Sequence, residues 1–400
     1  MHRPARLALA VCLASLPPLA AAQSKAAPSK APIANYWMDV ATVNVSIPGM
    51  QEMSDMPLVG GMMGNFFGGS KLGMVPGKWL DLAVYTREKP AGTEGSHAIP
   101  PAQAMGASLP LRPVPRPVPT TGNEATRDVD QQRPKGRLLL YWGCGESVRA
   151  GQPRILDMAS AAPQDFGKFF VGRYAPERGA TSEPGRAIWP NEEDKQRVPK
   201  ESSLRGDHAV SGAGIPASLK FALGEKQDFM DKLELAAPGD TKGSVRVSWN
   251  AVGTARAYFL SAVGGSENDL ILWSSSELPE AGLGLVDYLS NTQVDQWVKD
   301  KVLLPSTTQQ CAIPSGIYAA AGGAMVRAIA YGNELNLLHP PRPADAKLLA
   351  AWNPEWTLRV RVKSTSMTML GMQERESRRE ERKQEPANPL DILRKGIFGR

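Results

Sequence analysis

The feature that most constrains the fold is the run of alternating residues at 244–274. Apolar Val245, Val247 and Trp249 alternate with polar residues in its first part. Turns, the second of them rich in glycine, then separate this piece from two further apolar pieces. A period of two between turns is typical of antiparallel strands with one buried face, because successive side chains point to opposite faces of a sheet. The run predicts three consecutive strands.

Two longer strands are expected far apart in the sequence, at residues 35–47 and 356–369. In the first, Ala41, Val43 and Val45 alternate with polar residues, and in the second, apolar residues alternate with arginine and lysine. Because the two share this build and length, we expect them to be neighbours in one sheet, with a second domain inserted between them.

The expected fold class is mainly β, with two β-sandwich-like domains and one short inserted helix. The helix is placed at residues 291–304, capped by Asn291 or Thr292 and ended by Pro305. Shorter strands are expected at 324–331 and 335–338. In chain order, the segments are a signal peptide at 1–22, an N-terminal β domain at 33–230 with a Met- and Gly-rich segment at 48–75 and a Pro-rich insert at 98–136, a second β domain at 231–345, a strand at 354–372 returning to the first domain, and a charged tail at 373–400 with a short terminal helix.

Residues 1–22 have the composition of a secretory signal peptide. Arg3 and Arg6 precede a short apolar run, and three alanines end it at Ala22. The run is too short to cross a bilayer. We therefore expect cleavage near Ala22-Gln23 and a periplasmic or secreted mature protein.

Cleavage at that point leaves two cysteines, Cys144 and Cys311. In an oxidising compartment, two thiols favour one disulfide, which would tie the two halves of the chain together. The alternative is a pair of buried, unpaired thiols, because a sequence does not show whether two Cα atoms come within bonding range.

Two stretches are expected to lie on the surface without regular structure. Prolines are dense from Pro100 to Pro119 and alternate strictly from residue 112, which favours an extended polyproline II spacer. Residues 190–214 carry many charged and turn-forming residues and are expected to form a long loop.

Methionines in the Met- and Gly-rich segment suggest a copper site. Thioether sulfur is a soft ligand that suits Cu(I), and spaced methionines in envelope proteins resemble the motifs of copper carriers. A second methionine group follows the later long strand and would lie near the first if the two long strands pair. The candidate ligands are Met50, Met53, Met56, Met62, Met63, Met367, Met369 and Met372. The alternative is that methionine fills irregular apolar gaps.

Glycines in the same segment suggest a contact with a partner. Gly60, Gly64 and Gly68 recur every fourth residue, and on a helix they would form one smooth face for close packing against another helix or a membrane. Phe66 and Phe67 are apolar contacts beside it. The uncharged run is shorter than a full membrane crossing. The alternative is a glycine-rich loop, since glycine disfavours an isolated helix.

The C-terminal tail has the features of a docking peptide. A mixed-charge run precedes residues 388–391, whose order is that of a helix start. The short helix would present Leu390, Leu393 and Ile397 to a partner. The alternative is a frayed tail.

Signals of catalysis are missing from the sequence. There is no G-x-S-x-G motif and no P-loop, and the histidines His97, His208 and His339 have no metal-ligand spacing with each other or with cysteine. Paired carboxylates leave no local signature, so a hydrolase with unrecognised carboxylates stays open.

Residues in the second domain resemble a known family. They lie on three successive expected strands: Leu233 and Leu235; Val245, Val247 and Trp249; Tyr258 and Leu260. With these residues, the segment 232–339 resembles a fibronectin type III domain. The family's tyrosine on the penultimate strand is missing, and the helix at 291–304 is an insertion. The resemblance implies a spacer or binding sandwich without catalytic residues.

The function expected from these features is that of a non-enzymatic, exported cell-envelope protein for binding or assembly. Its contacts would be the Met- and Gly-rich segment and the tail, and its partner an envelope protein or the membrane surface. The formal net charge of +6 is small and dispersed, which does not favour a nucleic-acid partner. The alternatives are a periplasmic Cu(I)-binding protein and a hydrolase. The sequence does not indicate whether the chain forms a homo-oligomer.

Overall fold

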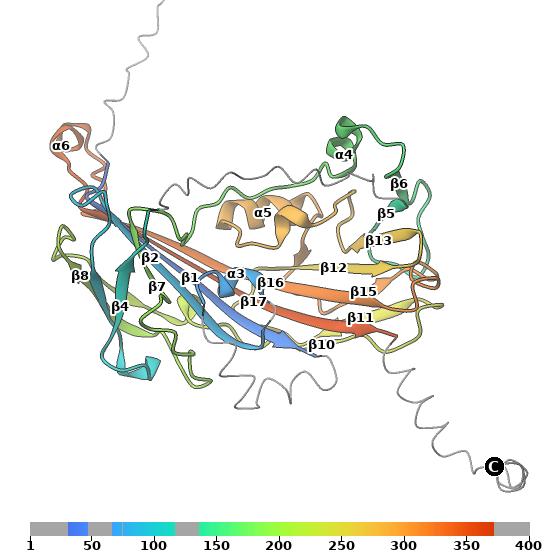
Figure 1. The fold of residues 1–400 in the computed structure, drawn as a ribbon, viewed down its shortest axis with the longest axis horizontal. Coiled ribbons are helices and arrows are strands. Elements are labelled where there is room, and N and C mark those ends of the chain that lie inside the picture. Colours follow the sequence, from blue (N-terminus) through green and yellow to red (C-terminus); the bar gives the residue numbers. More distant parts are fainter. Residues whose placement is uncertain (1–30, 47–65, 74, 117–135, 372–400) are drawn as a thin grey trace, which may run out of the picture.

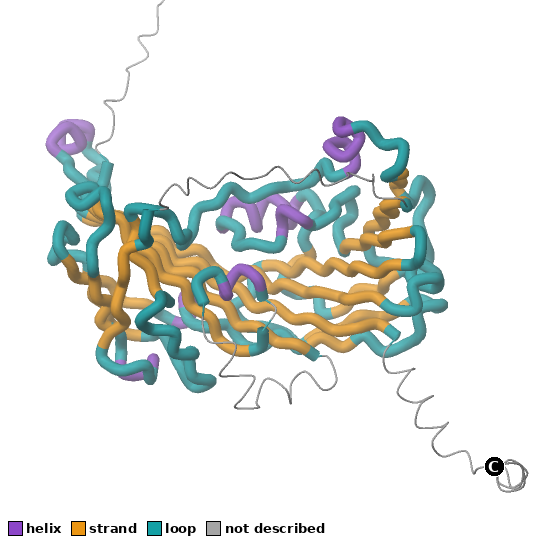
Figure 2. Tube along the Cα trace, viewed as in Figure 1, coloured by secondary structure: helices purple, strands orange, loops and turns teal. Residues whose placement is uncertain are grey.

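The computed structural model describes residues 31–46, 66–73, 75–116 and 136–371. In this part of the chain the protein is mainly β, as predicted, with a large sheet, a small sheet and few helices. Figure 1 shows long strands running side by side through the middle of the molecule. Figure 2 shows the helices as short pieces around these strands.

Among the described residues, one sheet contains fourteen strands and a second contains three. The large sheet, in spatial order, consists of β6 (Arg154–Asp157), β5 (Arg137–Trp142), β13 (Asp269–Ser274), β12 (Ala257–Gly265), β16 (Ala324–His339), β17 (Trp356–Leu370), β1 (Ala34–Val45), β2 (Gly77–Thr86), β7 (Arg186–Trp189), β4 (Ser108–Pro113), β3 (Gly95–Ala98), β8 (Gly206–Gly212) and β9 (Lys220–Leu223), with β14 (Leu304–Pro305) beside β12. The small sheet consists of β10 (Leu235–Ala236), β11 (Val245–Trp249) and β15 (Gln310–Ile313).

The two long strands expected to be neighbours pair with each other, which confirms that prediction. β1 and β17 run in parallel, from Ala34 opposite Trp356 to Val45 opposite Met367. On their other sides, β2 pairs with β1 and β16 pairs with β17, both in the antiparallel sense. Parallel strands need a long crossover connection, and here most of the described elements lie between β1 and β17 in the sequence.

The small sheet packs against one face of the large sheet. Trp249 of β11 contacts Tyr258 of β12, with ring centroids 5.5 Å apart. Val247 of β11 is buried in the same hydrophobic core as Leu358 of β17 and Leu82 of β2. Strands from both sides of residue 231 therefore share one large sheet and one core, and that residue does not separate two sheets.

Helices and loops cover the opposite face of the large sheet, here called the outer face. α5 (Asn291–Lys299) packs Val294 in one cluster with Phe259 and Ile329. α4 (Pro163–Phe169) packs Phe169 in a second cluster with Leu140. α3 (Gly69–Leu72) contacts β1 and β2, and α6 (Ala346–Ala351) lies between β16 and β17 in sequence. The outer face is thus covered in separate patches.

Two predicted elements differ from the structure at their ends. α5 is shorter than predicted, and its cap is Ser290, whose Oγ accepts from the Gln293 N–H (3.2 Å). Val302 and Leu303 lie beyond the helix but are buried in the same cluster, which explains why the apolar spacing predicted a longer helix. The strands predicted at 324–331 and 335–338 are one strand, β16, whose pairing register shifts in between.

Both predicted surface stretches contain strands. Within the Pro-rich insert, β4 pairs with β3 and β7 and buries Leu109 and Leu111, so residues up to Pro113 are not a spacer. β4 pairs with β3 along residues 108–111 and with β7 along residues 112–113, so each of these stretches has a partner strand on one side only. Proline is tolerated where its nitrogen lies on the unpaired side of a strand. Within the expected loop, β8 pairs with β3 and β9, with His208 and Val210 buried on one side.

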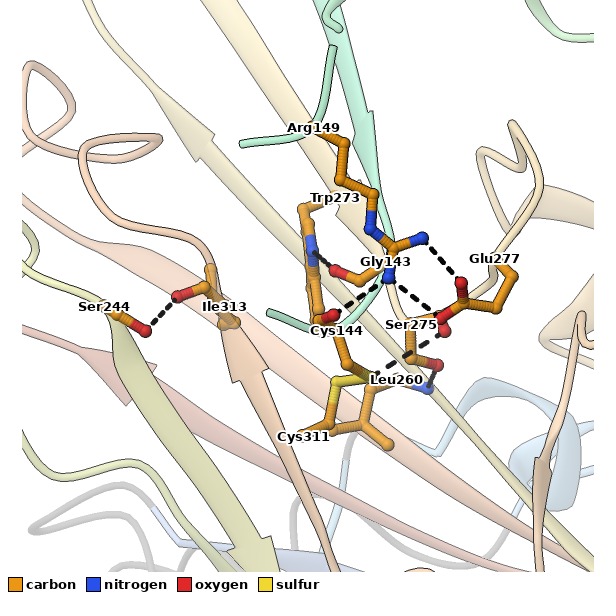
Figure 3. Close-up of a disulfide and its surroundings, with 10 residues drawn as sticks. All are labelled: Gly143, Cys144, Arg149, Ser244, Leu260, Trp273, Ser275, Glu277, Cys311 and Ile313. Carbon is orange, nitrogen blue, oxygen red and sulfur yellow. Dashed lines mark hydrogen bonds and ion pairs between the residues drawn. A yellow bond between two sulfur atoms is a disulfide. The ribbon is translucent and has the colours of Figure 1, made fainter. Parts of the chain in front are cut away.

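Cys144 and Cys311 form a disulfide with their Cα atoms 5.2 Å apart, which confirms the first of the two alternatives. Cys311 lies on β15 of the small sheet, and Cys144 follows β5 of the large sheet. Figure 3 shows Trp273 donating to the Gly143 carbonyl (3.1 Å) and Arg149 donating to the Cys144 carbonyl (3.0 Å). The bond ties the small sheet to the large one.

Candidate functional site

The two expected contact segments begin at the same end of the central strand pair. The Ser46 N–H, one residue beyond β1, donates to the Met367 carbonyl of β17 (2.7 Å). β17 ends soon afterwards, at Leu370. The parallel register therefore places the ends of β1 and β17, which precede the segment 48–75 and the tail 373–400 in sequence, at one end of the sheet. Antiparallel pairing would have placed them at opposite ends.

Three methionines meet on the outer face at this end of the sheet. Met325 of β16 lies directly opposite Met369 of β17, and Met367 is two residues away on the same face. Cβ atoms of directly opposed residues are about 4.5–5.5 Å apart. Met325 is 40% exposed, Met369 is half-buried and Met367 is buried. Met325 was missed in the sequence because only the register of β16 and β17 places it beside the other two.

The other predicted ligands and most of the predicted contact residues lie outside the described residues, as does the expected signal peptide. This group comprises Met50, Met53, Met56, Met62, Met63, Met372, Gly60, Gly64, Leu390, Leu393 and Ile397. Copper binding and partner contact at these positions stay predictions.

Asp81 of β2 attaches the end of the Met- and Gly-rich segment to the sheet. Its carboxylate accepts from the N–H of Gly68 (2.9 Å), from the N–H of Ser70 (3.2 Å) and from the Ser70 hydroxyl. Burial raises the pKa of the Asp81 carboxyl to about 7. The donors come from α3 and the residue before it, so this contact positions α3 over the outer face.

Gly68 is the one residue of the predicted glycine face that the structure describes, so the face stays a prediction. Gly68 has a φ of 90°, a left-handed conformation, and lies directly before α3. Phe67 packs in an apolar cluster with Ile188 of β7. Phe66 is 39% exposed, with its ring against Trp79 (5.2 Å between centroids). Of the three, Phe66 has the most side-chain surface available to a partner.

Two cations of β17 are buried in the outer face beneath this cover. Arg361 forms a bidentate ion pair with Asp39 of β1 (2.7 and 2.6 Å). The Lys363 ammonium donates to two backbone carbonyls of the covering segments (3.1 and 3.3 Å). The Tyr288 ring lies 4.6 Å from the Arg361 guanidinium and 4.4 Å from the Lys363 ammonium. Burial lowers the pKa of Lys363 to about 7.

A displaced pKa is a feature of catalytic groups, but the surroundings of Asp81 and Lys363 point to a structural role. Both side chains are buried, and both are engaged with α3.

Removing one partner of a buried ion pair such as Asp39–Arg361 typically costs about 3–5 kcal/mol. The buried polar groups therefore fix the covering segments to the central strands.

A second buried polar group joins three strands on the other side of the sheet. His208 Nε2 faces the Leu204 carbonyl (2.7 Å), which only accepts, so this nitrogen carries the proton. His208 Nδ1 then accepts from His97 Nε2 (2.9 Å), and His97 Nδ1 accepts from the Tyr36 hydroxyl (2.8 Å). Each hydrogen bond is satisfied with both rings neutral. The sequence carries no local signal of this chain, because its members are far apart.

No protein-family model matches the chain, and no curated protein is significantly similar to it. Among the described residues, no group of three or more His, Cys, Asp or Glu side chains is placed to hold a metal ion. No helix in the same part of the chain is long and apolar enough to span a bilayer.

The neutral histidine pair predicts a loss of stability in acid. Burial lowers the pKa of His97 and of His208, whereas unfolded histidine titrates near pH 6.5. The unfolded state binds more protons below that pH, so stability present above about pH 6.5 is lost as the pH falls. We expect the urea midpoint to drop between pH 7.5 and pH 5, and to drop less in His97→Gln/His208→Gln.

The matched control for this experiment is His339→Gln, which leaves the pair intact and should keep the pH dependence of the native chain. A double variant that loses stability as steeply as the native chain would show that other groups cause the effect.

Proposed function

We propose that this chain is a non-enzymatic, exported cell-envelope protein that binds or assembles with a partner through its Met- and Gly-rich segment and its C-terminal tail. The observation that carries the proposal is the parallel pairing of β1 and β17, because the strands that precede the two segments in sequence end at one end of the sheet. Two contact segments that begin side by side can engage one partner surface together, and linked contacts strengthen each other.

The disulfide supports export. Disulfides persist in oxidising compartments such as the periplasm and are rare in the reducing cytosol. Cys144 and Cys311 are 167 residues apart in the sequence, so the bond closes a long loop of the chain. This agrees with the signal peptide expected at residues 1–22.

The strand order supports the fibronectin type III resemblance, which we extend to residues 232–370. In constant-type immunoglobulin sandwiches the first, second, fourth and fifth strands share one sheet, and the third, sixth and seventh share the other. Here β10, β11 and β15 form one sheet, while β12, β16 and β17 are neighbours in the other. The fourth strand, β13, departs from the constant-type order because it pairs with β12. We propose a binding sandwich whose last strand, β17, joins it to β1.

The proposal predicts that both segments are needed for the same partner. Tagged protein lacking residues 386–400, or lacking residues 57–64, should recover less of a given partner from envelope extracts than the full chain. The control lacks residues 119–133, which connect to the fold elsewhere, and should recover the same amount. Equal recovery by all three variants would contradict the proposal.

The second candidate is a periplasmic Cu(I)-binding protein. The observation that favours it is the cluster of Met325, Met367 and Met369, because thioethers that share one sheet face can converge on a soft cation. The Ser46 N–H donates to the carbonyl of Met367, a member of the cluster. The methionines of the Met- and Gly-rich segment follow Ser46 in the sequence, beginning with Met50.

This candidate is tested by titrating Cu(I) into the purified protein against a chromogenic chelator. Met325→Leu/Met369→Leu removes two thioethers with little change in volume and should weaken binding about tenfold or more. Met105→Leu, at a buried methionine of another strand connection, should bind as the native chain does. Native binding no tighter than about 10⁻⁶ M would exclude the copper function.

A further inference from the structure

A cavity on the inner side of β1 and β2 has the chemistry of an anion site. It measures about 520 Å³, which is within the usual range for sites that hold small molecules. Its walls are the end of β1, the start of β2 and the segments 197–200 and 229–232. The cavity therefore lies between four pieces of chain, on the face opposite the methionine cluster.

Four cationic side chains line this cavity. Lys78 and Arg197 are half-buried in its wall, whereas Lys200 and Lys232 are exposed at its rim. One acidic residue, Asp231, is also in the lining and is exposed. The lining thus carries an excess of positive charge in a concave site, where field lines concentrate.

The half-buried cations are held in place by the fold. The Lys78 ammonium donates to the Ser202 carbonyl (2.7 Å) and lies 5.1 Å from the centre of the Phe229 ring. An ammonium has three N–H donors, and this hydrogen bond uses one of them. The Arg197 guanidinium donates to the Pro76 carbonyl (3.3 Å). A β-bridge between residues 78 and 198 joins their two segments.

Two further carboxylates, Asp228 and Glu201, act on Lys78 from outside the cavity lining. Asp228 accepts from the Ser203 hydroxyl (2.5 Å), from the Leu204 N–H (2.7 Å) and from the Phe229 N–H (2.8 Å). Burial lowers the pKa of Lys78, and Asp228, Glu201 and Asp231 together oppose that shift only in part. A cation that is short of solvation gains from an anionic ligand.

The remaining lining is apolar. Phe229, Met230 and Val198 supply aromatic and aliphatic surface between the cations. We propose that this cavity binds a small organic anion, with a phosphate or carboxylate group held by Lys78 and Arg197 and an apolar part against Phe229. This goes beyond the partner-binding function proposed above and does not depend on it.

The test is calorimetric titration of the full chain with three probes at low salt. Phenyl phosphate carries both the charge and the ring, inorganic phosphate only the charge, and phenol only the ring. We expect phenyl phosphate to bind at least about tenfold more tightly than either of the others. No detectable binding of phenyl phosphate, or equal binding of phosphate alone, would overturn the proposal.

Variants connect the binding to this cavity. Lys200→Gln/Lys232→Gln removes two exposed charges at the rim without disturbing the core and should weaken phenyl phosphate binding about tenfold. Arg197→Gln should weaken it by a similar factor. The control Lys220→Gln/Lys347→Gln makes the same change in net charge at exposed positions outside the lining and should leave the affinity unchanged. Equal affinity in the rim variant and the control would place the site elsewhere.

Discussion

The parallel pairing of β1 with β17 sets the positions of their neighbours in the large sheet, β2 and β16. It joins strands at nearly opposite ends of the described chain, so it is a contact of very long sequence separation. The bidentate Asp39–Arg361 pair crosses it in a buried position. Because an unpaired buried charge is costly, this contact disfavours any other register of the two strands.

That constraint determines what lies at each place around the central strands. On the outer face, Asp81 and Lys363 hold α3, and the methionine cluster follows at the end of the pair. On the inner face at the same end, Lys78 and the segment 229–232 enclose the cationic cavity. β1 and β17, the strands that precede the two proposed contact segments in sequence, end at this same end of the sheet.

Much of the strand content could be predicted from the sequence, because alternation over a half-buried face is a local signal. Val245, Val247 and Trp249 are buried on one side of β11, as the pattern indicates. Even the neighbourhood of β1 and β17 could be predicted, since their length and build match. What the pattern did not give is their parallel sense, nor that the three strands at 244–274 are divided between two sheets. The direction of the pairing and the division between two sheets depend on contacts between residues that are far apart in the sequence.

The candidate site was less predictable for the same reason. β8 has the composition of a loop and forms a strand because its backbone pairs on both sides. His97 and His208 are 111 residues apart, and no spacing rule joins them. Met325 becomes a candidate ligand only through the register of β16 and β17. The cavity is lined by four separate segments, and none of them alone has the composition of an anion site.

Engineered disulfides test the parallel register of β1 and β17. The side chains of Asn35 and Thr357 are hydrogen-bonded across the pair (2.6 Å), so cysteines at these two positions should form a disulfide on mild oxidation, detectable by peptide mass mapping. Cysteines at positions 35 and 367 lie at opposite ends of the pair and should remain thiols. A link between positions 35 and 367, without one between 35 and 357, would contradict the parallel register.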